Sequence, residues 1–166
     1  MFSHVLRHEN AGALGFQTSN LRKSCLRLAP LLTLFTLAAV AAGFTFGTIR
    51  PVGIDDALGG LALYLPWGLL QQYILNGYFY NRMEALTTPS RSSLIAAGLF
   101  AAVHSPNWFL MGFTLMAGYG ATVVYRKYRN LYVLGIAHAV IGLLLFLVVP
   151  DSISHHLRVG PGWFAQ

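Results

Sequence analysis

The stretch "LYLPWGLLQQYILNGYFYNR" (Leu63–Arg82) decides the fold, because three amides lie inside its apolar run, which ends at Tyr80. Gln71 and Gln72 are adjacent, and Asn76 follows about one helical turn later. In lipid, a polar side chain is costly and usually faces other protein or a cavity. The role of these amides therefore depends on whether lipid or water surrounds the segment.

The composition indicates a membrane protein with several spans. Of the 166 residues, 55% are hydrophobic and 10% are charged, and the mean hydropathy is +0.57. Soluble domains usually carry about 25% charged residues. At roughly 20 residues per spanning helix, a chain of this size can cross a bilayer about four to six times. The sequence thus predicts an all-α, polytopic integral membrane helical bundle whose first partner is the lipid bilayer.

The charge balance does not indicate a nucleic-acid partner. The net charge of +6 comes from 11 Lys+Arg against 5 Asp+Glu. In a soluble protein this excess would suggest a surface for nucleic acid. Here the basic residues cluster between apolar runs, which indicates membrane topology instead. The single cysteine, Cys25, excludes an internal disulfide.

About five membrane segments are expected within residues 28–149, between polar tails of residues 1–27 and 150–166. The expected segments are Leu28–Gly47, Ala57–Tyr80, Ser92–His104, Trp108–Tyr125 and Leu131–Val149. The third is too short for a full crossing, so it either extends back into the preceding loop or stops partway with His104 at its tip. A secretory signal peptide is the alternative for the first segment, because small residues lie near its end.

The distribution of basic residues predicts the orientation of the bundle. With the N-terminus inside, nine Lys and Arg residues fall in inner segments and two in outer segments. The inner set is Arg7, Arg22, Lys23, Arg27, Arg82, Arg91, Arg126, Lys127 and Arg129, and the outer set is Arg50 and Arg158. We therefore expect the tail of residues 1–27 to be cytoplasmic.

A set of polar side chains at membrane depth forms the candidate functional site: Gln71, Gln72, Asn76, His104 and His138. Gln72, Asn76 and Tyr80 are spaced i, i+4 and i+8, so they share a helix face that must contact protein. Counting residues from the span ends places Gln71 and His138 at a similar depth in the inner half of the bilayer. We expect two amides and two imidazoles to meet in one pocket.

Each of these polar groups also has a structural interpretation. A lone amide in a spanning helix is most often an interhelical hydrogen-bonding group. A lone membrane histidine can be structural, or it can be functional because imidazole titrates near neutral pH. His155 and His156, in the outer tail, are expected to be solvated.

Three motifs on successive segments resemble the CPBP group of intramembrane proteases, named for CAAX proteases and bacteriocin-processing proteins. The family patterns are a glutamate pair followed by Arg-Gly, an FxxxH sequence, and a histidine followed four residues later by Asn or Asp. The corresponding stretches are "QQYILNG" (Gln71–Gly77), "FAAVH" (Phe100–His104) and "HAVIG" (His138–Gly142). The resemblance covers residues 63–149.

The resemblance implies an intramembrane endopeptidase that cleaves a membrane-associated peptide or protein, located in a bacterial inner membrane. In active members the first glutamate is taken to activate water, and the histidines and the Asn form an oxyanion site or hold a metal. By position, His104, His138, Gln71 and Gln72 are the catalytic candidates. Asn76, which stands where the family has arginine, is the candidate for substrate binding.

The departures from the family pattern bear directly on the chemistry. A carboxamide does not accept a proton as a general base must, so a histidine would have to activate water while the glutamines orient it or the carbonyl oxygen. His104 and His138 are also the candidate metal ligands, but a catalytic zinc usually needs three protein ligands. The cofactor is left undetermined. Gly142 stands where the family has Asn or Asp.

Two other functions remain open at this level. One is a catalytically inactive relative that binds membrane helices or lipidated peptides in the same pocket. The other is a small transporter or proton-conducting bundle, because membrane histidines can relay protons.

Overall fold

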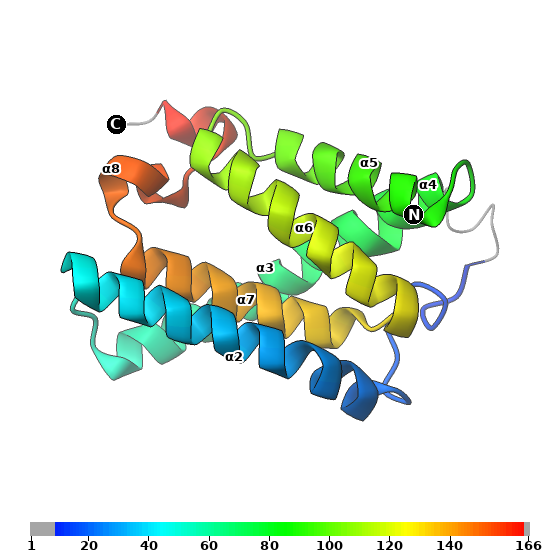
Figure 1. The fold of residues 1–166 in the computed structure, drawn as a ribbon, viewed down its shortest axis with the longest axis horizontal. Helices are drawn as coiled ribbons and strands as arrows, with labels where there is room; N and C mark the ends of the chain where they lie inside the picture. Colours follow the sequence, from blue (N-terminus) through cyan, green and yellow to red (C-terminus); the bar gives the residue numbers. More distant parts are fainter. Residues whose placement is uncertain (1–8, 165–166) are drawn as a thin grey trace.

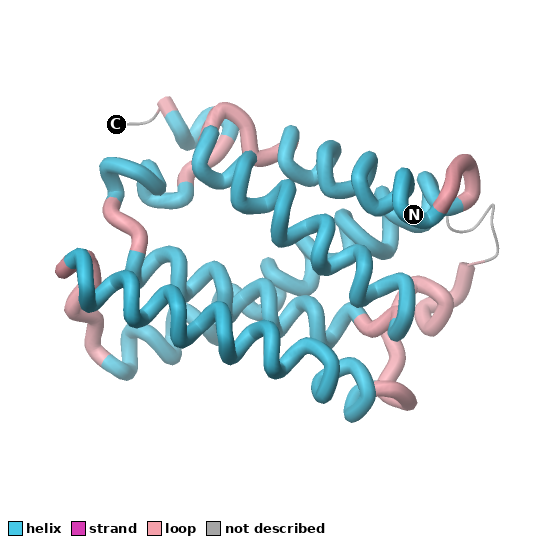
Figure 2. The backbone as a smooth tube through the Cα atoms, in the orientation of Figure 1, coloured by secondary structure: helices cyan, strands magenta, loops and turns pink. Residues whose placement is uncertain are grey.

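A computed structural model describes residues 9–164, in which the regular elements are all helices (Figure 2). The long helices are α2 (Leu21–Phe46), α3 (Ile54–Gln72), α5 (Pro89–Ala102), α6 (Trp108–Tyr128) and α7 (Leu131–Val148). A π-helix, η1 (Tyr73–Tyr80), continues α3 directly into the short α4 (Asn81–Glu84). The C-terminal tail contains α8 (Asp151–Ser154), η2 (His155–Leu157) and η3 (Gly160–Trp163). The all-α prediction is confirmed.

The helices form two layers (Figure 1). One layer consists of α2, α3 and α7, and the other consists of α5 and α6. The π-helix η1 links them, because it contacts α5 and α6 as well as α3. The buried core beside η1 contains Leu75, Tyr80, Phe100, Tyr125 and Leu131, which are almost completely shielded. The two motif stretches "QQYILNG" and "FAAVH" therefore face each other across the junction of the layers.

Two glycines allow α3 and α7 to approach closely. A Cβ at Gly68 would lie 2.7 Å from the carbonyl oxygen of Gly135, and a Cβ at Gly135 would lie 2.9 Å from Cα of Leu69. A larger side chain at either position would meet backbone atoms and push the helices apart. Contacts through small residues are typical of membrane helix pairs. This contact brings His138, one turn after Gly135, against Gln72.

Three of the described helices are long and apolar enough to cross a membrane, namely α2, α6 and α7. The first of them begins at Leu21 rather than at the expected Leu28, so part of the expected polar tail is helical. Residues 1–8 of that tail lie outside the described residues. α3 has Asp55 and Asp56 in its first turn and ends with the two glutamines. Together with η1 and α4 it forms one continuous helical segment that ends at Glu84.

The segment before His104 does both things that the sequence allows. It extends back into the preceding loop, and it stops partway across the membrane with His104 at its tip. α5 begins at Pro89, within the expected loop, and ends at Ala102. Its 14 residues rise ~21 Å, less than the ~30 Å of a hydrocarbon core. His104 follows in a turn and is only 8% exposed. Irregular backbone at membrane depth is tolerated where protein buries it or a cavity adjoins it.

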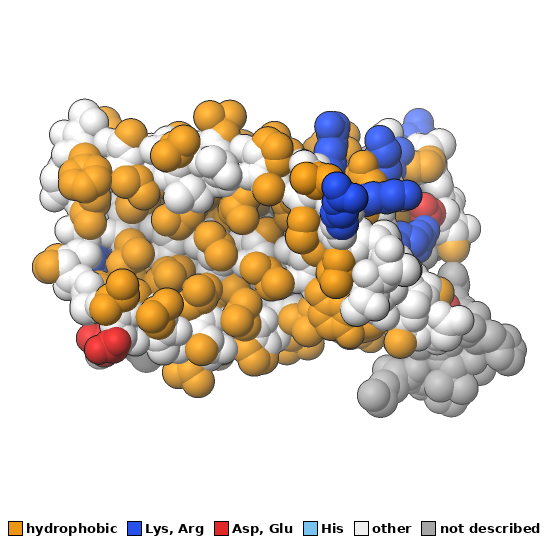
Figure 3. Space-filling view, turned by 90° about the horizontal axis from the view of Figure 1, so that it is seen from below, with side chains coloured by type: hydrophobic (Ala, Val, Ile, Leu, Met, Phe, Trp, Pro, Cys, Tyr) orange, Lys and Arg blue, Asp and Glu red, His pale blue; other side chains and the backbone are white. Residues whose placement is uncertain are grey.

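Charged side chains gather at the two ends of the bundle, and large apolar side chains cover the surface between them (Figure 3). At one end Arg129 pairs with Glu84 at 2.5 Å, and Arg82 pairs with Glu9 at 2.7 Å. At the other end Arg50 pairs with Asp151 at 2.5 Å. An apolar belt between polar ends is the surface of an integral membrane protein. The cytoplasmic location of the Arg129 end stays a prediction.

Candidate functional site

A cavity of about 840 Å³ lies between the two layers, and we call it the interlayer cavity. Its wall is mostly apolar, with side chains such as Leu31, Phe35, Phe113 and Ile141. A volume of this size is sufficient for a ligand or a peptide segment. The four predicted catalytic residues all line it: Gln71, Gln72, His104 and His138. Residue counting predicts a similar depth for Gln71 and His138, and the structure brings these two together with Gln72 and His104 around one space.

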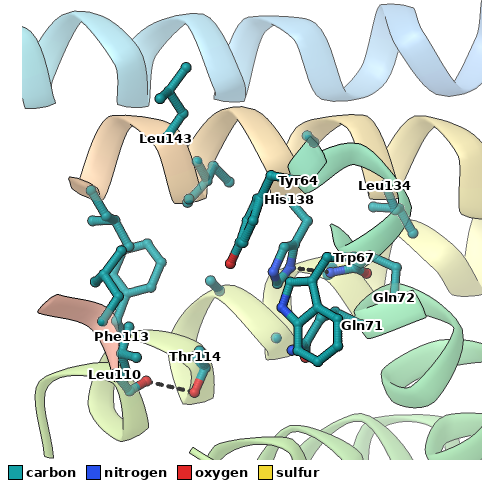
Figure 4. Close-up of a pocket in the computed structure, with 18 of the residues that line it drawn as sticks. Tyr64, Trp67, Gln71, Gln72, Leu110, Phe113, Thr114, Leu134, His138 and Leu143 are labelled. Atoms are coloured by element: carbon teal, nitrogen blue, oxygen red, sulfur yellow. Dashed lines mark hydrogen bonds between the residues drawn. The ribbon is translucent and has the colours of Figure 1, made fainter. Parts of the chain in front are cut away.

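Three elements bring these side chains together, and Figure 4 shows Gln71, Gln72 and His138. Gln71 and Gln72 end α3, at the point where the helix widens into the π-helical turn that begins at Tyr73. His138 projects from the middle of α7, which the glycine contact holds against α3. His104 arrives from the other layer, in the turn after α5. π-Helical turns are frequent at functional sites.

A chain of hydrogen bonds fixes Gln72 and His138. The Asn76 side-chain amide donates to Oε1 of Gln72 at 2.8 Å, so Nε2 of Gln72 faces Nδ1 of His138 at 3.2 Å. Nε2 of Gln72 is a donor, so Nδ1 of His138 must accept and carries no proton. In a neutral imidazole the other nitrogen then bears the proton. His138 therefore presents Nε2–H as a hydrogen-bond donor.

His104 is held in the opposite tautomer. Its Nδ1 lies 2.7 Å from the carbonyl oxygen of Phe100, and a carbonyl can only accept, so Nδ1 donates. Nε2 of the neutral ring is left with a lone pair. The Phe100 ring contacts both histidines edge-on, with centroid distances of 4.8 Å to His104 and 6.3 Å to His138. The site thus holds one imidazole that can take a proton and one that can donate a hydrogen bond.

The remaining predicted residues differ in position. Gln71 lines the interlayer cavity and has no hydrogen-bond partner among the described residues, so its amide is available to a ligand. Asn76, the candidate for substrate binding, is completely buried and does not line the cavity. Asn76 acts on the site through its hydrogen bond to Gln72. Its Oδ1 is buried and has no hydrogen-bond partner among the described residues. Asn76 therefore does not contact a substrate bound in the interlayer cavity.

The donor set does not fit a catalytic zinc. Such a site usually has three protein ligands and an open position. The described residues contain no cluster of three His, Cys, Asp or Glu side chains. Asp56 is the only acidic side chain among the described residues that line the cavity, but it lies 15 positions before Gln71, which is ~22 Å along a helix. The Nε2–H of His138 is a donor and not a ligand.

The structure adds residues that the motifs do not indicate. Tyr64 and Trp67 of α3 line the cavity beside the histidines (Figure 4). The Tyr64 ring stacks on His138, with centroids 6.2 Å apart and planes 25° apart. The sequence spacing could have indicated Tyr64 as a site residue, because it precedes Gln71 by seven residues and so lies on the same helix face.

The C-terminal tail also reaches the cavity. His156, Leu157 and Val159 line its far end. Nδ1 of His156 lies 3.1 Å from Oδ1 of Asp151, and the His156 side chain is 58% exposed, which agrees with the expected solvated state. Asn107 holds the tail, because its Nδ2 donates to the carbonyl oxygens of Ser154 and Arg158 at 2.8 and 3.0 Å. Its Oδ1 meanwhile accepts from the backbone of Leu110 and caps α6.

Comparison with known proteins agrees with the motifs. No curated protein and no solved structure matches the chain. The family model described as "Type II CAAX prenyl endopeptidase Rce1-like" matches residues 53–144. The matched region is more than half of the chain, and it runs from the start of α3 into the C-terminal half of α7. It contains all the candidate site residues. The chain therefore belongs to the Rce1-like family of type II CAAX prenyl endopeptidases, within the CPBP group.

Proposed function

We propose that this protein is an intramembrane endopeptidase that hydrolyses a membrane-associated peptide or protein, with His104 as the base that activates water. The observation that carries the proposal is the position of Gln71, Gln72, His104 and His138 around one apolar cavity, in a chain of a protease family. An apolar cavity excludes bulk water, so hydrogen bonds inside it act more strongly on a reacting group than they would in solution.

The two tautomers assign distinct roles to the histidines. Nε2 of His104 takes a proton from a water molecule as the water oxygen attacks the carbonyl carbon of the scissile bond. The oxygen of that carbonyl becomes an oxyanion, which accepts a hydrogen bond from Nε2–H of His138. Collapse breaks the C–N bond, and the leaving nitrogen receives the proton from His104. The products are a carboxylic acid and an amine, and the base returns to its starting state.

The glutamines support this chemistry without performing the proton transfer. Gln72 holds the His138 ring in the tautomer that donates, and Asn76 in turn holds Gln72. Gln71, with its free amide in the cavity, orients the attacking water or the substrate carbonyl. A charged residue at this depth would be expensive, whereas a neutral amide provides hydrogen bonds at lower cost.

Cleavage of membrane-anchored peptides tests the proposal. The protein in lipid nanodiscs is incubated with a library of such peptides, and products are identified by mass spectrometry. We expect products with the wild type, none with His104→Ala, and a large loss with His138→Ala. His155→Ala is the matched control, because His155 does not line the cavity and contacts Trp163 in the tail. Cleavage that survives His104→Ala would contradict the role of this base.

A second candidate function follows from the amides themselves. Neither Gln71 nor Gln72 can act as a general base, and the cavity wall is apolar enough to hold a membrane helix or a lipidated peptide. In this alternative the protein binds such a segment without cleaving it. Intact peptide that copurifies with the protein, with no product formed, would favour the binder over the enzyme.

For the location we propose a bacterial inner membrane with the N-terminus in the cytoplasm. Cys25 is the single cysteine of the sequence, and it is exposed near the basic start of α2. In intact bacterial cells, a thiol reagent that cannot cross membranes should leave Cys25 unmodified, and cell disruption should make it reactive. Labelling in intact cells would reverse the proposed orientation.

A further inference from the structure

Gly142 leaves a space in the interlayer cavity that another side chain fills. It lies one helical turn after His138 on α7 and lines the same cavity. A Cβ built at Gly142 would overlap Cε1 of Tyr64 and lie 3.1 Å from Cζ and 3.2 Å from Cδ1 of that ring. Any side chain at position 142 would displace the tyrosine. Tyr64 and Gly142 are therefore sterically matched.

The polar end of Tyr64 lies in the cavity. Figure 4 shows the hydroxyl beside the His138 ring, with Trp67 next to it. The ring itself stacks on His138 at a centroid distance of 6.2 Å. Trp67 also lines the cavity beside Tyr64. The Tyr64 hydroxyl donates to no acceptor among the described residues, so its proton is available to a ligand.

We propose that Tyr64 is a catalytic residue, whose hydroxyl and the His138 Nε2–H together bind the oxyanion of the tetrahedral intermediate. This inference rests on the endopeptidase function proposed above. Tyr64 forms and breaks no covalent bond and keeps its proton throughout. The Tyr64 hydroxyl, from α3, and the His138 ring, from α7, lie side by side in the cavity. Two donors are thereby available to one oxyanion.

Binding of a charged analogue tests the proposal without requiring turnover. The probes are two N-palmitoylated tetra-alanine peptides in lipid nanodiscs. One has a phosphinate in place of the central amide, which mimics the oxyanion, and the other has a neutral ketomethylene group of the same length. Dissociation constants are measured for the wild type and for Tyr64→Phe, which keeps the ring and removes the hydroxyl.

We expect the wild type to bind the phosphinate peptide at least about tenfold more tightly than the ketomethylene peptide. Tyr64→Phe should lose most of that preference, because each removed oxyanion donor weakens such binding by about tenfold or more. Affinity for the ketomethylene peptide should change by less than about twofold in the same variant. Equal losses for both peptides, a preference that Tyr64→Phe leaves unchanged, or no preference in the wild type would each overturn the proposal.

The matched pair provides a rescue. Tyr64→Ala removes the donor and opens the space beside Gly142, and the added change Gly142→Asn places an amide donor there. We expect the double variant to regain at least about threefold of the phosphinate preference that Tyr64→Ala loses. A double variant with no more preference than Tyr64→Ala would contradict a donor role.

Parallel cleavage assays separate this proposal from the function on which it rests. If the wild type cleaves peptides and Tyr64→Phe keeps the same kcat and KM, Tyr64 has no catalytic role and the endopeptidase function stands. If the wild type cleaves nothing but shows a phosphinate preference that depends on Tyr64, the endopeptidase function fails while the oxyanion-binding role of Tyr64 stands.

Discussion

The polar groups at the end of the bundle near Arg129 and those in the interlayer cavity follow opposite rules. At the end, full charges are used: Arg129 binds Glu84 at 2.5 Å and Asn81 at 3.1 Å, and Arg82 binds Glu9 through two oxygens. In the cavity, the network from Asn76 through Gln72 to His138 consists of neutral groups.

The difference reflects the cost of charge at each depth. At a membrane interface, water and headgroups solvate a charged pair, and the long side chains reach them easily. In the hydrocarbon region an ionised side chain is expensive unless it is paired. The cavity keeps its hydrogen-bonding geometry with amides, which avoids that cost but leaves histidine as the base.

The largest expected effect comes from placing a charge in the cavity. Gln71→Glu adds a carboxylate beside the two histidines, and this carboxylate can activate water directly. We expect kcat on a membrane-anchored reporter peptide to rise by about a hundredfold, the scale of a well-placed general base. Gln71→Met, which has a similar size and no amide, is the control and should show no gain. An unchanged rate in Gln71→Glu would show that position 71 does not face the reacting water.

Gln72→Glu should change the tautomer of His138. A carboxylate can only accept, so Nδ1 of His138 would then carry the proton and Nε2 would lose its donor function. We expect kcat to fall by about tenfold or more, as when an oxyanion donor is removed. Nitrogen-15 NMR of labelled histidine identifies the protonated nitrogen in each variant. The same nitrogen protonated in both proteins would contradict the role assigned to Gln72.

At the charged end, Arg129→Ala should lower the free energy of unfolding by about 1 kcal/mol, because the side chain is about a third exposed and such pairs contribute modestly. Lys127→Ala is the control, because this side chain is exposed and lies over the Tyr128 ring. This change should lower the free energy of unfolding by less than about 0.5 kcal/mol. Both are measured by denaturant unfolding in detergent. An equal loss of unfolding free energy in both variants would show that the hydrogen bonds and ion pair of Arg129 do not stabilise the fold.

The smallest effect concerns the tail that closes the far end of the cavity. The hydrogen bond from Arg50 lowers the pKa of the Asp151 carboxyl below its ordinary value. A lowered folded-state pKa means that the stabilisation is present above the ordinary carboxyl pKa and is lost as the pH falls through the lowered value. We expect the C-terminal tail to exchange amide hydrogens faster in Asp151→Asn than in the wild type near neutral pH. The difference should disappear in strong acid, and a constant difference would contradict this linkage.

Sequence reasoning predicted those parts of the site that depend on position along a helix. Residue counting placed Gln71 and His138 at one depth, and the i, i+4, i+8 spacing placed Gln72, Asn76 and Tyr80 on one face, where all three are buried. It could not predict that Asn76 lies behind Gln72, because that depends on the rotation of the helix and on the π-helical turn after Gln72. The Tyr64–Gly142 match was also missed, because it involves packing between helices distant in sequence.

The most direct test of the central claim is hydrolysis in water enriched in oxygen-18. The wild-type protein in nanodiscs should produce a peptide with one oxygen-18 atom in its new C-terminal carboxyl group, and His104→Ala should produce none above background while it still binds the intact peptide. Intact peptide that remains bound to the wild type without any labelled product, or labelled product that persists in His104→Ala, would contradict a site of neutral side chains in which His104 activates water.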